Sequence, residues 1–277
     1  MSRAAEIHVF NHHAMATHFQ VRIAGQDAEY AGQAARALFD SVDGLEDLLS
    51  RFRETSEIAQ IAQLKPGEQL RLSEPVFACL EIARDMEAAT LGAFSITAAA
   101  RKTRSAMPRW SLDRAGLAIH CEEGCLEMDL GAIGKGFALD RIAEELADWD
   151  CPSHLLVAGG SSILAGDPPS GMAAWDSRVG DDAASFRYWL THGALSGSGI
   201  AVKGLHILDP RTGKPAVQRS RAWVAAPSAA VSDALSTACM VLTRSEIARV
   251  MNASSDWHAL LSDGGGSTYF SHRCRTP

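Results

Sequence analysis

The chain has 277 residues, of which 47% are hydrophobic, and it carries a formal net charge of −7. This length and this apolar share suffice for an independently folded protein, and we predict a single domain over residues 1–277. The acidic balance, without any run of Lys and Arg, argues against a protein that binds a nucleic-acid backbone.

Periodic hydrophobic patterns predict the elements in the first half of the chain. Alternating apolar residues predict two strands, at 18–25 and 126–130. Apolar residues at helical spacing predict three helices, at 34–52, 72–92 and 137–149. The apolar stripe of the first helix extends to Phe52, while the second helix has Ser73 as its N-cap and Gly92 as its stop. Neither pattern is present from 101 to 113.

The second half of the chain is predicted to be richer in short strands. The segments with β-type patterns are 154–160, 173–180, 185–190, 221–228, 258–262 and 267–271. Two further segments, 231–243 and 244–253, have helical patterns. Because helices and strands do not alternate strictly, the order favours an α+β fold with a largely antiparallel sheet flanked by helices.

The sequence shows no targeting or membrane signal. Its first ten residues, MSRAAEIHVF, have no apolar core of signal-peptide length, and no run of about 18 apolar residues occurs. The six cysteines lack zinc-ribbon spacing, so we interpret them as reduced thiols. We therefore expect a soluble cytoplasmic protein that has neither nucleic acid nor a membrane span among its partners.

The helix predicted at 231–243 (VSDALSTACMVLT) contains two polar residues at a spacing that suits metal binding. Asp233 and Thr237 lie four residues apart, so their side chains share one face of a helix and can converge on a cation. Alternatively, Ser232 or Asp233 is only an N-cap and Thr237 bonds back to its own helix. The pattern alone leaves both interpretations open.

Two glycine-containing segments are candidate loops of a binding site. In DLGAIGKGFALD (129–140), glycines, a helix N-terminus and Lys135 together favour an anion, although the segment matches neither common phosphate-loop pattern. A plain turn between strand and helix is an equally good interpretation. In HILDPRTGKPA (206–216), Pro210 and Gly213 predict a chain reversal, and Arg211 is a candidate partner for a nearby carboxylate.

Seven segments, in order, resemble motifs of the FAD:protein FMN transferases, the ApbE family. They are MATHFQV, LLSRFRETSEIAQI, GAFSIT, MDLGAIGKGFALDRIAEEL, ALSGSG, HILDPRTGKPA and VAAPSAAVSDALSTA, and they cover Met15 to Val241. The resemblance implies a flavin-transferase architecture related to the T-fold. It also implies Mg²⁺-dependent transfer of FMN from FAD to a Ser or Thr hydroxyl of an acceptor protein, with release of AMP.

The same resemblance assigns roles to individual residues. The implied Mg²⁺ ligands are the backbone carbonyl of Ala132 and the side chains of Asp233 and Thr237, with Asp233 also counted as catalytic. The residues implied to contact FAD are Met15, Phe52, Ala93, Phe94, Ser95, Asp129, Lys135, His206 and Ile207. His206 is also the implied general base, because an imidazole near neutral pKa can accept a hydroxyl proton. Alternatively, His206 is merely packed before a strand.

The sequence departs from the family pattern at several positions. The substituted positions are Ser95 for Asp, Phe52 for Tyr, Ala16 for Gly and Gly134 for Ala, and GGSSILAG replaces a Gly-Gly-Asp or Gly-Gly-Asn segment. Only six residues separate ALSGSG from His206, so the Tyr-containing loop that the family has at this place is missing. Its absence concerns the handling of the acceptor protein more than the binding of FAD.

Two alternative functions follow. One is an Mg²⁺-dependent FAD pyrophosphatase that gives FMN and AMP, and the other is a non-catalytic FAD-binding protein. The chain start also lacks a lipobox, which points to a cytoplasmic acceptor.

Overall fold

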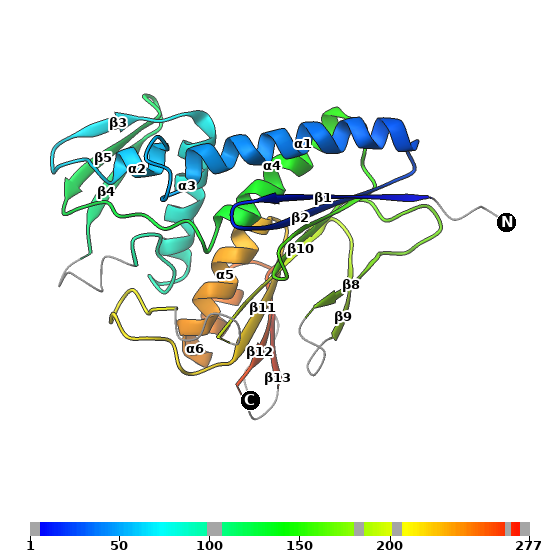
Figure 1. The fold of residues 1–277 in the computed structure, drawn as a ribbon. Helices are drawn as coiled ribbons and strands as arrows, with labels where there is room; N and C mark the ends of the chain where they lie inside the picture. The colour runs from blue at the N-terminus through cyan, green and yellow to red at the C-terminus, as the bar shows by residue number, and fades with distance from the viewer. Residues whose placement is uncertain (1–5, 99–106, 180–185, 201–206, 264–266, 272–277) are drawn as a thin grey trace.

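The computed structural model describes residues 6–98, 107–179, 186–200, 207–263 and 267–271. Its main feature is an eight-stranded sheet in the order β1-β2-β6-β7-β10-β11-β12-β13 (Figure 1). Those strands are Ile7–Ala14, Thr17–Ala24, His154–Ala158, Ser162–Ala165, Gly193–Gly199, Arg221–Ala226, His258–Ser262 and Ser267–Ser271. Each neighbouring pair in this sheet is antiparallel, which confirms the predicted sheet type.

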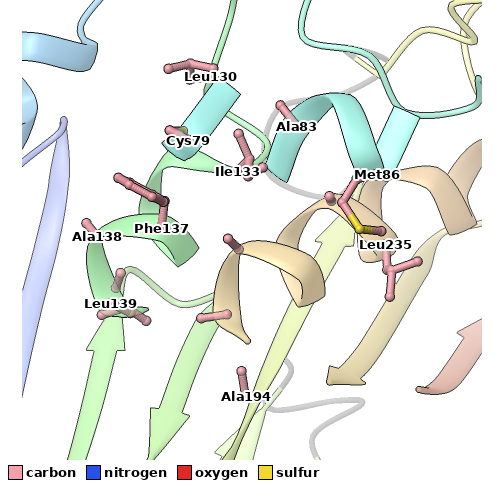
Figure 2. Packing of buried hydrophobic residues seen from close by; sticks show 14 of the residues in the cluster. Cys79, Ala83, Met86, Leu130, Ile133, Phe137, Ala138, Leu139, Ala194 and Leu235 are labelled. Atoms are coloured by element: carbon pink, nitrogen blue, oxygen red, sulfur yellow. The ribbon is translucent and has the colours of Figure 1, made fainter. Parts of the chain in front are cut away.

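Helices cover one face of the large sheet and bury the main core against it. The helices are α1 (Ala28–Leu49), α2 (Glu57–Ile61), α3 (Glu74–Ala89), α4 (Gly134–Asp148), α5 (Ala229–Val241) and α6 (Arg244–Met251). Figure 2 shows α3, α4 and α5 meeting in this core, where Cys79, Phe137 and Leu235 lie among other buried apolar side chains. This packing fixes α4, which carries Lys135, and α5, which carries Asp233 and Thr237, side by side on the sheet.

Two smaller sheets complete the described fold. Strands β3 (Gln69–Arg71), β5 (Ala118–Glu123) and β4 (Arg109–Asp113) form an antiparallel sheet beside α2 and α3 (Figure 1). Strands β8 (Trp175–Val179) and β9 (Phe186–Leu190) form a hairpin, and Trp175 and Leu190 pack in a second apolar cluster with Leu155 and Leu195 of the large sheet. No helix in the described part of the chain is long and apolar enough to cross a membrane.

The strand predicted at 126–130 and the helix predicted at 34–52 differ from the structure. Residues 126–130 are not a strand, because Leu126, Met128 and Leu130 are buried in an irregular segment. The first helix begins earlier, at Ala28 after the N-cap Asp27, and it ends at Leu49. Phe52 therefore lies outside the helix and is 82% exposed, so its assignment to the apolar stripe was wrong.

Two of the strands that the sequence analysis missed, β4 and β10, lack a clear hydrophobic pattern. β4 lies in the segment where no pattern was found, and β10 has the sequence GALSGSG, whose glycines and serines are poor strand formers. In β10, a side chain at Gly197 would come within 2.5 Å of the Trp223 ring on β11. Gly197 is thus required by the close approach of a neighbouring aromatic residue, a constraint that local pattern does not reveal.

Candidate functional site

Asp233 lies on the buried face of α5, against the large sheet and the start of α4. The N-cap of α5 is Ser228, whose hydroxyl accepts a hydrogen bond from the Val231 N–H, so the N-cap interpretation of Ser232 and Asp233 is wrong. Asp233 is only 4% exposed. A buried carboxylate is stable only when its oxygens receive hydrogen bonds or an opposite charge.

Three groups from two segments, β7 and the start of α4, surround the Asp233 carboxylate. Ser162 of β7 donates its hydroxyl to Asp233 Oδ1 at 2.6 Å, and the Gly136 N–H donates to Oδ2 at 2.8 Å. The Lys135 ammonium nitrogen lies 3.7 Å from Oδ2. The glycine loop and the α5 carboxylate, 97 residues apart, therefore form one site.

The contact between Asp233 and Gly136 completes the start of α4. The first three N–H groups of a helix have no partner within the helix, and the N-cap Ile133 offers no side-chain hydrogen bond. Asp233 supplies the missing acceptor from another helix. Gly136 permits this contact, because a Cβ at this position would lie 2.7 Å from Ala230 N and would overlap the Ala229 carbonyl.

Asp140 of α4 makes the corresponding contact with the start of α5. Its carboxylate accepts hydrogen bonds from Ser228 Oγ at 2.7 Å, from Ala229 N at 2.7 Å and from Ala230 N at 2.9 Å. Burial raises the pKa of the Asp140 carboxyl, and these hydrogen bonds offset part of that rise. The two helices thus exchange capping carboxylates, an arrangement that the sequence analysis missed.

Arg219 holds the opposite end of α5. Its guanidinium is buried and donates hydrogen bonds to the carbonyls of Cys239, at 2.8 Å, and Leu242, at 2.5 Å. These carbonyls lie in the last turn of the helix, where a positive charge is favourable. Burial lowers the pKa of Arg219. The helix that carries Asp233 and Thr237 is therefore fixed at both ends by charged side chains of suitable sign.

Thr237 is half-buried and faces β10. Its hydroxyl oxygen lies 3.1 Å from Ser198 Oγ, which in turn lies 2.9 Å from Ser236 Oγ. Ala132 is half-buried in the turn before α4. The structure thus places Asp233 and Thr237 on one helix beside the start of α4, while the role of Ala132, Asp233 and Thr237 as metal ligands stays a prediction.

The segments that contain Phe52, Ser95 and Asp129 converge next to the glycine loop. The Asp129 N–H donates to the Ile96 carbonyl at 2.7 Å, and Arg51 Nη1 lies 3.6 Å from Asp129 Oδ2. The Arg51 guanidinium stacks on the Phe52 ring. Ser95 Oγ lies 3.0 Å from the hydroxyl of Thr97. Sequence reasoning did not select Arg51, although its guanidinium lies against two predicted FAD contacts, Phe52 and Asp129.

The other predicted FAD contacts fall into two groups. Ala93 and Phe94 are both 1% exposed, with side chains in the main core. Met15 lies in the turn between β1 and β2, and its N–H donates to Glu46 Oε2 at 2.8 Å. Met15 and Ala16 both have positive φ, 50° and 54°, so Ala16 adopts a conformation that glycine would adopt with less strain.

Ile207 begins the turn that contains Arg211. The Ile207 carbonyl accepts the Ala216 N–H at 2.8 Å, and the turn is closed by the Gly213 N–H on the Asp209 carbonyl at 2.7 Å. Arg211 pairs with Asp209 at 3.0 Å and with Glu246 of α6 at 2.7 Å, which confirms its predicted carboxylate pairing. His206 lies outside the described residues.

The donor set around α5 is unlike a metal centre built from side chains alone. Among the residues that the structure describes, no group of three or more His, Cys, Asp or Glu could hold a metal ion. The predicted set contains one carboxylate, one hydroxyl and one backbone carbonyl. Such a site suits a hard cation that keeps water and substrate phosphate in its coordination shell.

The chain has the same fold as solved structures of ApbE proteins. The chain superposes on the flavin transferase ApbE from Vibrio cholerae with a TM-score of 0.81 and 20% identity, covering 97% of this chain and 98% of that one. It superposes equally well, at a TM-score of 0.81 and 23% identity, on the ApbE protein from Thermotoga maritima, covering 96% and 97% of the two chains. These matches confirm the predicted architecture.

Sequence comparison identifies the family. Residues 15–261 match the ApbE family, and the chain therefore belongs to it. A relative from Klebsiella pneumoniae (strain 342), named FAD:protein FMN transferase, is 24% identical over 216 residues. That match spans 65% of this chain and 66% of the relative's length.

Proposed function

We propose that this protein transfers FMN from FAD to a Ser or Thr hydroxyl of an acceptor protein, in a reaction that requires Mg²⁺ and releases AMP. Membership of the ApbE family supports the reaction class, and the name of the Klebsiella relative supports FAD and a protein acceptor. The observation that carries the proposal is the junction of Asp233 and Thr237 with the glycine loop, where Lys135 approaches the same carboxylate.

The oxygen donors at this junction fit Mg²⁺. An ionised carboxylate has about four lone-pair positions. Among the described residues, Ser162 and Gly136 donate hydrogen bonds to two of those positions on Asp233. The remaining positions and the Thr237 hydroxyl are hard oxygen donors of the kind that Mg²⁺ prefers. Bound there, Mg²⁺ would neutralise the FAD pyrophosphate and the charge that develops as AMP leaves.

The residues of the chain then have separate tasks. The acceptor oxygen forms a bond to the phosphorus on the FMN side, and the bond from that phosphorus to the AMP oxygen breaks. Lys135, at the second position of α4, adds positive charge beside the pyrophosphate together with the helix N-terminus. His206 accepts the hydroxyl proton, a role that rests on the family resemblance alone.

In the decisive experiment, the purified protein is incubated with FAD and Mg²⁺, with and without a lysate of its source cells as the supply of acceptor protein. AMP is followed by chromatography, and covalent flavin is followed by in-gel fluorescence. A fluorescent acceptor band that requires Mg²⁺ is expected. Asp233→Asn retains an acceptor for the Gly136 N–H but removes the negative charge, and it should lower the rate at least roughly 100-fold. Ser232→Ala is the matched control, because it removes a buried hydroxyl of α5 that donates to the Val224 carbonyl and contacts neither Asp233 Oδ1 nor Asp233 Oδ2.

Other outcomes separate the alternatives. AMP and FMN without a labelled band would identify an FAD pyrophosphatase, which the short connection between β10 and Ile207 favours because it shortens the segment expected to handle an acceptor. Tight FAD retention in EDTA with no AMP would identify a flavin-binding protein. Full Mg²⁺-dependent turnover by Asp233→Asn would refute the assignment of the metal ligand.

A further inference from the structure

Three serines of the large sheet face the polar side of α5. Ser162 is on β7, and Ser196 and Ser198 are on β10, and we call this set the serine platform. Ser162 and Ser196 are direct partners across the antiparallel pair, so their side chains lie on the same face. Ser198 is two residues further along β10 and shares that face, because side chains alternate along a strand.

Two serines of the platform each contact a different predicted metal ligand. Ser162 Oγ is fully buried and donates to Asp233 Oδ1 at 2.6 Å. Ser198 Oγ lies 3.1 Å from the Thr237 hydroxyl and 2.9 Å from that of Ser236. Ser196, between them in the sheet, is also fully buried, but its hydroxyl has no hydrogen-bond partner within the described structure.

The direction of the hydrogen bonds among Ser198, Ser236 and Thr237 can be assigned by counting donors. A serine or threonine hydroxyl donates one hydrogen bond only. The Ser236 hydroxyl donates to the Asp233 carbonyl at 2.9 Å, so it must accept from Ser198. Ser198 has then used its proton and must accept from Thr237. The chain of donation runs from Thr237 through Ser198 and Ser236 to the backbone of α5.

This direction of donation leaves the Thr237 oxygen ready to bind a cation. A hydroxyl that binds a cation does so through a lone pair, and its proton must point elsewhere. Ser198 takes up that proton, and the lone pairs of Thr237 Oγ1 remain available. Ser162 has the corresponding effect on Asp233, since its short hydrogen bond to Oδ1 fixes the rotation of the carboxylate. The lone pairs that neither Ser162 nor the Gly136 N–H occupies remain available.

We propose that Ser162 and Ser198 are positioning residues that orient the Asp233 carboxylate and the Thr237 hydroxyl toward a divalent cation, and so set the affinity of the site for it. This inference rests on the proposed function, because it assumes that Asp233 and Thr237 hold the cation. It adds two residues to the site that neither the helix pattern nor the glycine loop indicates. Ser196 has no such task.

The test measures metal binding directly, without turnover. Mn²⁺ is titrated into the purified full-length protein with ADP as the pyrophosphate probe, and free Mn²⁺ is followed by electron paramagnetic resonance. Ser162→Ala and Ser198→Ala should each weaken Mn²⁺ binding roughly 10–100-fold, the usual effect of losing a group that orients a metal ligand. Ser162→Thr, which keeps the hydroxyl, should retain binding.

Ser196→Ala is the matched control, because it removes a buried hydroxyl from the same sheet face without touching either ligand. Its Mn²⁺ affinity should equal that of the wild type. FAD binding in EDTA, measured by flavin fluorescence, should be unchanged in all the alanine variants. Unchanged Mn²⁺ affinity in Ser162→Ala and Ser198→Ala, or an equal loss in Ser196→Ala, overturns the inference alone. Absence of Mn²⁺ binding by the wild type overturns the proposed function as well.

Discussion

Substitution of Gly136 by alanine should be strongly destabilising, although it replaces a poor helix former with a good one. The new Cβ would lie 2.7 Å from Ala230 N, whereas ordinary contact begins near 3.4 Å, and its overlap with the Ala229 carbonyl is greater. Both neighbours are backbone atoms, so the starts of α4 and α5 would have to separate by about 1 Å. The Gly136 hydrogen bond to Asp233 would then lengthen from 2.8 Å to about 3.8 Å and be lost.

The expected loss of stability follows from these contacts. Separation of the helices also weakens the hydrogen bonds from Ala229 and Ala230 to Asp140. Three hydrogen bonds at about 1 kcal/mol each and overpacking of about 1–3 kcal/mol oppose a gain of about 1 kcal/mol in helix propensity. We therefore expect the free energy of unfolding to fall by about 3–5 kcal/mol.

Urea unfolding followed by circular dichroism measures this change, and Gly44→Ala is its control. Gly44 is an exposed residue within α1, and a Cβ there meets no atom within 4 Å. Its substitution should leave stability unchanged or raise it by up to about 1 kcal/mol. If Gly136→Ala is as stable as Gly44→Ala, the close approach of the two helices is not a constraint and the argument fails.

Three further predictions concern other buried groups. Arg219→Ala should lower the free energy of unfolding by about 3 kcal/mol, measured by urea unfolding, because two carbonyls of α5 lose their donors. Burial raises the pKa of the Cys79 and Cys239 thiols to about 12, so iodoacetamide followed by peptide mass mapping should label Cys125 and spare both until unfolding. The pKa of Asp140 is raised from 3.8 on folding, so its contribution to stability is fully present at low pH and falls as pH rises through the folded pKa. The stability of the wild type relative to Asp140→Asn should therefore shrink as pH increases from about 4, and a constant difference would contradict this.

Local pattern predicted the longer helices and the shared helix of Asp233 and Thr237, but it missed the short helix α2. Apolar spacing identified α3, α5 and α6, and the spacing of four placed Asp233 and Thr237 on one helix face. Ranges were less accurate where a side chain outside the pattern determined the end, as with the N-cap Asp27 of α1. Residues 126–130 were misassigned because their apolar alternation reflects burial in an irregular segment.

Residues that act across long sequence separations escaped the sequence analysis. Asp140 occupies a polar position in an amphipathic helix, where a solvated acid is the ordinary expectation, and only the structure shows its contact with the start of α5. Arg219 and Ser162 are similar cases, since each bonds a group on α5 that is distant in sequence. A hydrophobic pattern predicts only the helix or strand that contains a residue. The contacts of Asp140, Arg219 and Ser162 depend instead on which other element packs against that helix or strand.

The exchange of capping carboxylates between α4 and α5 also bears on when the site can form during synthesis. The start of α4 leaves the ribosome about 95 residues before Asp233, which at ordinary translation speeds corresponds to roughly 5–20 seconds. Through that interval the Gly136 N–H has no acceptor from α5, and the proposed set of Mg²⁺ ligands is incomplete. A nascent chain that ends before α5 should therefore be unable to retain a divalent cation, and the site should appear only when both helices are available to dock.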